Sequence, residues 1–146
     1  MEKGDKVMAY IRCESGSKTP SMTETTLWTN ATPTANFDSQ TVTLSENITN
    51  YDYIKFEWCA NKTHVSVTCS MLIPVSDWIT TNSDYNKTWV CLCGGDSGNT
   101  SGHRGGRGTY YSADNKVRFN NAHHLEGSGY TNNMAIPLAI KGVTLG

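Results

Sequence analysis

The chain has 146 residues, a formal net charge of −1 and only 17% charged residues. This length suits one domain with a hydrophobic core, and a nearly neutral chain has no general attraction for nucleic acid or an anionic membrane surface. No stretch is apolar for long enough to cross a membrane as a helix. The N-terminal residues lack the apolar segment of a secretory signal, so we expect synthesis in a cytosol, with the protein staying there or leaving by cell lysis.

The beginning of the chain is polar, apart from one short apolar stretch. We expect residues 1–24 to form an arm or linker and residues 25–146 to form one β-domain. A free polar terminus of this length is normally disordered, so an ordered arm would be one that another subunit holds. The candidate residues for this assembly contact are Val7, Met8, Tyr10 and Ile11.

The clearest structural signal is a β-hairpin with one apolar face. In residues 51–58 apolar side chains alternate with polar ones, and residues 64–71 repeat the pattern. A period of two puts each apolar set on one face of a strand. The polar tetrapeptide 60–63 lies between the two segments and suits a tight connection.

A turn centred on this tetrapeptide also predicts a register for the hairpin. Phe56 then lies opposite Val67, and both faces of the ladder match in polarity. In this register Cys59 and Cys69 are separated by about 16 Å along the strands. That distance is too long for a disulfide, and Trp58 falls on the core face.

Further short strands are expected between turn signals. The predicted strands are 40–44, 88–93, 109–112, 116–120 and 134–145, with Asp114-Asn115 as the turn between 109–112 and 116–120. The second hairpin strand continues to Pro74, which indicates an edge or a bend. A short helix is the only helical candidate, at 76–80. Loops are expected at 80–87, at the glycine-rich segment 94–108, and at 123–133. This pattern predicts an all-β, antiparallel sandwich or jelly roll.

The five cysteines do not form the pattern of a full disulfide framework, because their number is odd and no secretory signal precedes them. Cys91 and Cys93 are expected on one side of a strand. Together with His123 or His124 they could form a zinc site, but structural zinc sites usually contain a second closely spaced pair of ligands, and this sequence has none. We therefore expect small buried thiols, with no metal and no cofactor.

Aromatic and glycine-rich segments supply the candidate contact residues. Trp58 and Trp89 are expected in the core, whereas Trp28 and Trp78 flank turns and remain candidate interface anchors. The glycine-rich segment lacks the pattern of a phosphate-binding loop, so we expect a solvent-exposed loop that can contact another subunit or a receptor. The candidate contact residues on this and neighbouring segments are Tyr85, His103, Arg104, Arg107, Tyr110 and Tyr130.

Several short sequence segments resemble those of a small β-domain of bacteriophage structural proteins. These are LWTNATPTANFDSQTVTLS at 27–45, YDYIKFEW at 51–58, IPVSDW at 73–78 and IPLAIKGV at 136–143. Such domains occur in tail, fibre and other virion-surface proteins, often of phages of Gram-positive or gut bacteria. The resemblance implies a non-enzymatic virion component that is made in the host bacterial cytoplasm. It also implies a homo-oligomer, with a trimer as the expected state, that contacts other virion proteins through its arm and a host surface glycan through its loops.

Two other classes of function, a carbohydrate-binding module and a hydrolase, would require different features of the sequence. A carbohydrate-binding β-sandwich module would present a groove of exposed aromatic side chains. A hydrolase would need converging carboxylates or a nucleophile with its base, and the sequence contains no such motif. We therefore expect no catalytic activity, no nucleic-acid partner and no membrane insertion.

Overall fold

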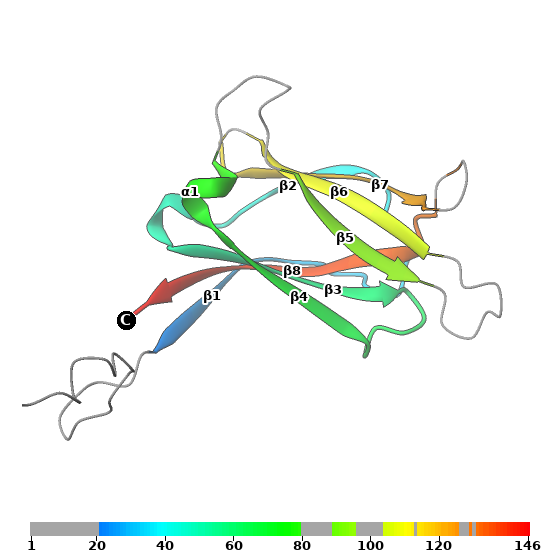
Figure 1. The fold of residues 1–146 in the computed structure, drawn as a ribbon, viewed down its shortest axis with the longest axis horizontal. Helices are drawn as coiled ribbons and strands as arrows, with labels where there is room; N and C mark the ends of the chain where they lie inside the picture. The colour runs from blue at the N-terminus through cyan, green and yellow to red at the C-terminus, as the bar shows by residue number, and fades with distance from the viewer. Residues whose placement is uncertain (1–20, 80–88, 96–103, 113, 126–128, 130) are drawn as a thin grey trace, which may run out of the picture.

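The structure is a computed structural model that describes residues 21–79, 89–95, 104–112, 114–125, 129 and 131–146. Within these residues the predicted all-β sandwich is confirmed, as two antiparallel sheets of four strands each (Figure 1). The arm candidates Val7, Met8, Tyr10 and Ile11 lie outside the described residues. β1 begins at Met22, inside the range predicted as an arm.

The two sheets face each other as two layers (Figure 1). The first sheet has the order β1 (Met22–Thr29), β8 (Met134–Leu145), β3 (Tyr53–Asn61) and β4 (Thr68–Pro74). The second sheet has the order β2 (Gln40–Thr43), β7 (Lys116–His124), β6 (Arg104–Ser112) and β5 (Val90–Gly95). A 3-10 turn, η1 (Ile48–Asn50), precedes β3, and a short helix, α1 (Val75–Trp78), follows β4.

The core lies between the sheets and is built by strand alternation. In β5, for example, Val90 and Leu92 are buried, while Cys91 and Cys93, which alternate with them, are exposed. The buried cluster that forms the core contains Leu27, Phe37, Val42, Leu44, Ile48, Ile54, Phe56, Trp58, Cys59, Val75, Trp78, Val90, Leu92, Val117, Phe119, Ala135, Ile136 and Ile140. Trp58 is thus a core residue, as predicted. Trp78 is also buried, against Phe56 and Tyr111, so its prediction as an interface anchor is wrong.

The turn between β6 and β7 follows the prediction from Asp114-Asn115. Both residues have positive φ, 64° and 58°, which is the backbone of the tight hairpin turns that Asp and Asn tolerate. The Tyr111 hydroxyl accepts a hydrogen bond from the Asn115 amide at 3.1 Å. A local sequence signal therefore determined this connection.

The β3–β4 hairpin exists, but its predicted register is wrong by four residues. Phe56 lies opposite Met71 instead of Val67, and Trp58 lies opposite Cys69. The two cysteines are therefore near neighbours on the ladder instead of about 16 Å apart, although both are free thiols.

Asn61 explains the longer connection. Its Oδ1 accepts hydrogen bonds from the amide and the hydroxyl of Thr63, at 2.9 and 2.7 Å. Its Nδ2 donates to the Gly95 carbonyl at 2.8 Å, and the next amide, of Lys62, donates to the Asn133 carbonyl at 2.9 Å. These tertiary contacts hold Asn61 in the strand, so the chain reverses over residues 62–67 and not at 60–63.

β4 extends beyond the area that the second sheet covers. β5 packs over β3 and β8, whereas β4 makes its main contacts with β3 and α1. Thr68 through Leu72 are consequently exposed on both faces of the strand, including Met71 and Leu72. The prediction that this strand reaches Pro74 as an edge is confirmed.

The described positions of the glycine-rich segment 94–108 lie in strands. Gly94 and Gly95 belong to β5, and Arg104 to Gly108 belong to β6, so the predicted loop is wrong for these positions. Gly94 is required by a close approach, because a Cβ there would lie 2.5 Å from the Ala135 amide nitrogen. Glycine therefore serves strand packing here, and not chain flexibility.

Candidate functional site

The structure separates the predicted contact residues. Tyr85, His103 and Tyr130 lie outside the described residues. Arg104 is exposed at the start of β6, and Tyr110 lies half-buried on the outer face of the same strand. Arg107 is 0% exposed, so it cannot act as a surface contact, and that prediction is wrong.

Arg107 is an interior hydrogen-bond donor. Its guanidinium donates to the carbonyls of Ala135 (Nε, 3.0 Å), Asn120 (Nη1, 2.6 Å) and Met134 (Nη2, 3.3 Å). It also lies 5.0 Å from the centre of the Phe37 ring, a cation–π distance. Burial lowers the pKa of Arg107 to about 10, against the raising effect of the Asp38 charge, so the group is protonated at neutral pH. Arg107 thereby ties β6 to β7 and β8.

The outer face of the second sheet carries the most exposed tryptophan among the described residues. Trp89 is 50% exposed and its ring lies 4.5 Å from that of Tyr110. Side-chain alternation predicts a core position for Trp89, on the same face as Cys91 and Cys93. The shared face is confirmed, but it is the outer face, because Val90 and Leu92 point inward.

Two glycines form the floor between these side chains. A Cβ at Gly108 would lie 3.1 Å from the Trp89 ring, and a Cβ at Gly106 would lie 3.0 Å from the Cys91 sulfur. The side chains of β5 therefore lean over β6, where no side chain opposes them. In the sequence, Gly106 and Gly108 alternate with Arg107 and Thr109, which is a strand pattern. The high glycine content led instead to the prediction of a loop.

A polar hollow adjoins this aromatic pair on β7. It has a volume of about 240 Å³ and is lined by Ser39, Asn120, Asn121 and His123. The Asn120 amide nitrogen is 3.7 Å from the position of a Cβ at Gly108, so the hollow and Trp89 are contiguous across that glycine. Sequence reasoning did not identify Ser39, Asn120 or Asn121, since isolated polar residues on a strand carry no motif.

The Cys91 and Cys93 sulfurs lie 3.8 Å apart on the same face. Burial, and then the Cys93 thiol, raise the pKa of Cys91 above its ordinary value. Both residues are exposed, as is Cys69, so the prediction of small buried thiols holds only for Cys59 among the described cysteines. No group of three or more His, Cys, Asp or Glu side chains suited to a metal occurs in the described part of the chain.

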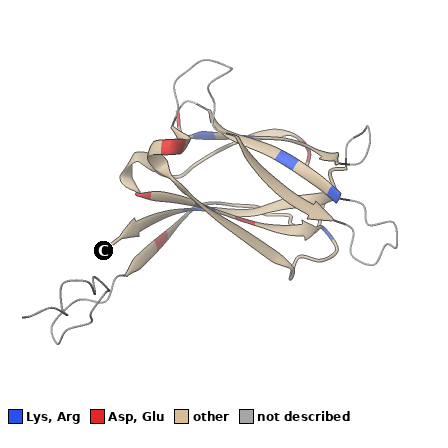
Figure 2. Cartoon of the chain, in the orientation of Figure 1, with Lys and Arg blue, Asp and Glu red and all other residues tan. Residues whose placement is uncertain are grey.

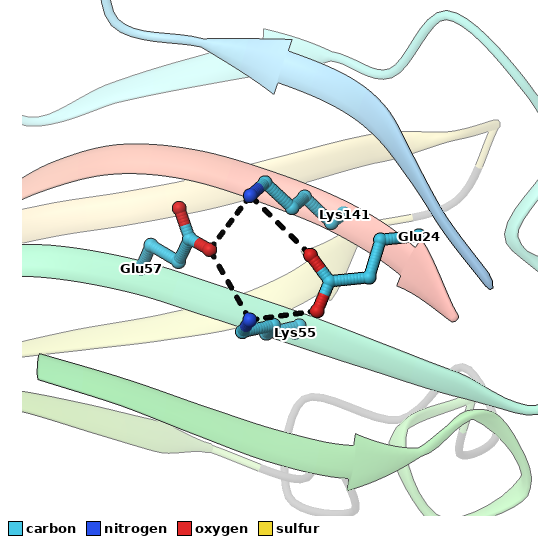
Figure 3. A network of polar contacts seen from close by, with 4 residues as sticks. All are labelled: Glu24, Lys55, Glu57 and Lys141. Atoms are coloured by element: carbon cyan, nitrogen blue, oxygen red, sulfur yellow. Dashed lines mark hydrogen bonds and ion pairs between the residues drawn. The ribbon is translucent and has the colours of Figure 1, made fainter. Parts of the chain in front are cut away.

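Charged residues are spread thinly over the described strands of both sheets (Figure 2). Their one compact cluster lies on the outer face of the first sheet (Figure 3). There Lys55 and Lys141 are directly opposite each other in the β3–β8 ladder, a pairing of like charges that is unfavourable by itself. Glu24 bridges the two lysines at 2.7 and 3.4 Å, and Glu57 bridges them at 3.4 and 2.8 Å. The four side chains form a closed ring of opposite charges.

The pKa values reflect this ring. The hydrogen bond from Lys55 lowers the pKa of Glu24 below its ordinary value, against the effect of burial. The hydrogen bond to Glu24 raises the pKa of Lys55, and the one to Glu57 raises the pKa of Lys141. A shallow hollow of about 290 Å³ beside the ring is lined by Lys55, Glu57, Thr68, Cys69 and Ser70.

The ring should stabilise the fold most strongly between the two titration ranges. A carboxyl with a lowered pKa adds stability above its unfolded value of 4.5 and loses it as the pH falls through the lower folded value. A lysine with a raised pKa adds stability below 10.5 and loses it as the pH rises through the higher folded value. Glu24→Gln is therefore expected to lower the free energy of unfolding at pH 7 by less than about 1 kcal/mol. Urea unfolding at pH 3, 7 and 11 measures this effect.

Salt provides the control for this prediction. The loss in Glu24→Gln should shrink in about 1 M NaCl, where exposed charges are screened. Glu46→Gln is the matched control, because the Glu46 carboxylate accepts a hydrogen bond from the neutral Tyr51 hydroxyl at 2.6 Å. An equal dependence on salt in both variants would contradict an ionic origin.

No helix of the described residues is long and apolar enough to cross a membrane. Comparison with known proteins adds no relative: no family model, no curated protein and no solved structure matches the chain.

Proposed function

We propose that the chain is a non-enzymatic structural protein of a bacteriophage particle, which assembles with further copies of itself and with other virion proteins. Two kinds of support lead to this proposal. The sequence segments at 27–45, 51–58, 73–78 and 136–143 resemble those of virion β-domains. The observation that carries the assembly role is the uncovered edge strand β4.

β4 is an exposed edge strand to which another strand could be added. Met71 and Leu72 are exposed on opposite faces, and Leu72 has 41% of its surface accessible. Within the described residues β4 pairs only with β3, so its other edge presents unpaired backbone groups. Natural proteins usually protect such an edge with charges, prolines, bulges or a covering segment. The sequence of β4, TCSMLIP, contains no charged residue, and its one proline, Pro74, is the last residue of the strand.

The β5 edge of the second sheet differs from the β4 edge. The Trp58 indole donates to the Cys93 carbonyl and the Asn61 side-chain amide donates to the Gly95 carbonyl, both at 2.8 Å. Side chains of the first sheet therefore occupy backbone acceptors of β5. This contrast favours β4 over β5 as an assembly edge.

Strand addition at β4 allows two symmetries. Pairing of β4 with β4 of a second copy gives an isologous dimer, whereas pairing of β4 with β1 of the next copy is heterologous and gives a ring if the rotation between copies closes, or a filament if it does not. Both β4 and β1 are edges of the first sheet. The expected state is a trimer built by the second arrangement, with loops at its surface facing the host.

Light scattering coupled to size exclusion tests the assembly. The wild-type chain should elute as an oligomer, and Leu72→Lys, which places a charge on the pairing strand, should elute as a monomer. Leu145→Lys is the matched control, because Leu145 is 51% exposed but lies at the end of β8. A wild-type monomer, or an oligomer that survives Leu72→Lys, contradicts assembly through β4.

The location of the protein tests the virion role. Cryo-electron microscopy of an intact phage particle should show density for the sandwich at a symmetric position. Recovery of the chain from a secreted bacterial complex that contains no phage particle would overturn this part of the proposal, whatever the oligomeric state.

A further inference from the structure

The outer face of the second sheet combines an exposed aromatic platform with a polar hollow. Trp89 is half exposed and contacts Tyr110, while Gly108 leaves the space beneath the indole free of any side chain. A buried role explains the other tryptophans better, since Trp58 and Trp78 belong to the core. Core packing therefore does not account for Trp89.

The polar side chains next to this platform are hydrogen-bonding groups. The hollow is lined by a hydroxyl, two amides and an imidazole, from Ser39, Asn120, Asn121 and His123. Among the described residues no carboxylate and no lysine lines it. Within the described residues the side-chain amide of Asn120 makes no hydrogen bond, whereas the backbone carbonyl of Asn120 accepts one from Arg107. This side-chain amide is therefore available to a ligand.

The walls of the hollow are held in place before any ligand arrives. Asn121 Oδ1 accepts hydrogen bonds from the Ser39 amide and from Asn132 Nδ2, both at 2.9 Å. Arg118 donates to the Ser39 hydroxyl at 2.6 Å, so its charge is engaged at the rim. Such preorganisation reduces the entropy that binding must overcome.

We propose that this face binds a neutral glycan. A pyranose ring has an apolar face of C–H groups, which fits the flat indole of Trp89, and a rim of hydroxyls, which fits amide and hydroxyl partners such as Asn120 and Ser39. Aromatic side chains offer a large contact area at low entropic cost, and a few convergent polar groups then fix orientation. Among the described lining residues no lysine or arginine is present to pair with an acidic group, which favours a neutral saccharide over an acidic one.

This inference goes beyond the proposed assembly role and uses a different surface. The glycan face lies on β5, β6 and β7, whereas assembly uses β4 of the first sheet. Leu72→Lys should therefore leave saccharide affinity unchanged, and Trp89→Ala should leave the oligomeric state unchanged. Failure of one proposal can thus be recognised without affecting the other.

Titration with a panel of neutral oligosaccharides tests the inference. The panel contains β-1,4- and α-1,4-linked glucose hexamers, a mannose hexamer and an N-acetylglucosamine hexamer. Isothermal titration gives the affinity, and acrylamide quenching of tryptophan fluorescence reports protection, because Trp89 is the most exposed indole. We expect at least one saccharide to bind saturably and to reduce quenching of the wild-type protein.

Two variants and one control locate the site. Trp89→Ala should weaken binding by about tenfold or more, and Asn120→Ala should weaken it independently if loss of the indole impairs folding. Leu145→Ala removes a comparably exposed apolar side chain from the end of β8 in the first sheet and should bind as the wild type does. Circular dichroism confirms that each variant is folded.

The contrary outcomes are equally specific. Lack of binding by every saccharide up to about 10 mM, where a Kd near 1 mM would be seen, overturns the proposal. Unchanged affinity in both Trp89→Ala and Asn120→Ala also overturns it. A change of oligomeric state in Trp89→Ala would instead identify this face as a protein interface.

Discussion

Arg107→Ala is expected to lower the free energy of unfolding by about 3–5 kcal/mol, because three backbone carbonyls lose their donor and each buried unsatisfied group costs about 1–3 kcal/mol. Arg107 is fully buried and serves three backbone carbonyls, of Ala135, Asn120 and Met134. Truncation would leave these acceptors without their donor in an interior that water does not reach, and each unsatisfied group is costly. Urea unfolding at pH 7, followed by tryptophan fluorescence, measures the loss.

Two further substitutions separate charge from geometry in this effect. Arg107→Lys keeps the charge but has no planar fork, so it cannot reach three carbonyls at once, and an intermediate loss is expected. Arg104→Ala is the matched control, because Arg104 is exposed at the start of the same strand. Its effect should stay within about 0.5 kcal/mol. An Arg107→Ala protein as stable as the wild type would contradict a structural role for this residue.

Gly94→Ala should produce the second large loss of stability, near the upper end of the 1–3 kcal/mol that is typical of overpacking. The added Cβ would lie 2.5 Å from the Ala135 amide nitrogen and would also overlap the Ala60 carbonyl oxygen. Both obstacles are backbone atoms of the first sheet, so no side chain can rotate away. Ala135 already has a positive φ of 48°, which leaves it little freedom to yield.

Gly108→Ala is the control for this substitution. Its Cβ would also meet an atom at short range, but that atom belongs to the exposed Trp89 ring. The ring can turn toward solvent, so the loss should remain below about 1 kcal/mol. Thermal unfolding followed by circular dichroism compares the two variants, and equal losses would show that the sheets do not approach closely at Gly94.

Alternation of side chains was sufficient to predict several features of the fold. Ile54, Phe56 and Trp58 share the core face, as their period of two indicates. The pair Asp114-Asn115 specified the hairpin turn between β6 and β7, because few other residues tolerate positive φ. Both signals are local, so they can be recognised without knowing which strands pair in the folded protein.

The hairpin register could not be obtained in this way. A shift by four residues preserves which residues face the core, so the predicted pairing of Phe56 with Val67 and the observed pairing with Met71 are equally consistent with alternation. Asn61 decides between them through hydrogen bonds to Thr63 and Gly95. The Gly95 contact comes from the opposite sheet, and the sequence of the hairpin contains no information about it.

The candidate glycan face was missed for a related reason. Periodicity placed Trp89 on one side of its strand with Cys91, but it does not say which side is inside. Val90 and Leu92 occupy the interior instead. They are buried because β5 packs over β3 and β8, and this packing cannot be read from the sequence of β5 alone.

The sequence by itself determined the class of this protein as an all-β sandwich, which residues of a strand share one face, and one of its turns, since these depend on side-chain alternation and backbone preference. Only the tertiary structure decided the register of β3 with β4, the interior place of Arg107, and the exposure of β4 and Trp89. Each of these depends on what the opposite sheet covers and which backbone groups it brings within hydrogen-bonding distance. Such contacts join residues far apart in the chain, and no local pattern encodes them.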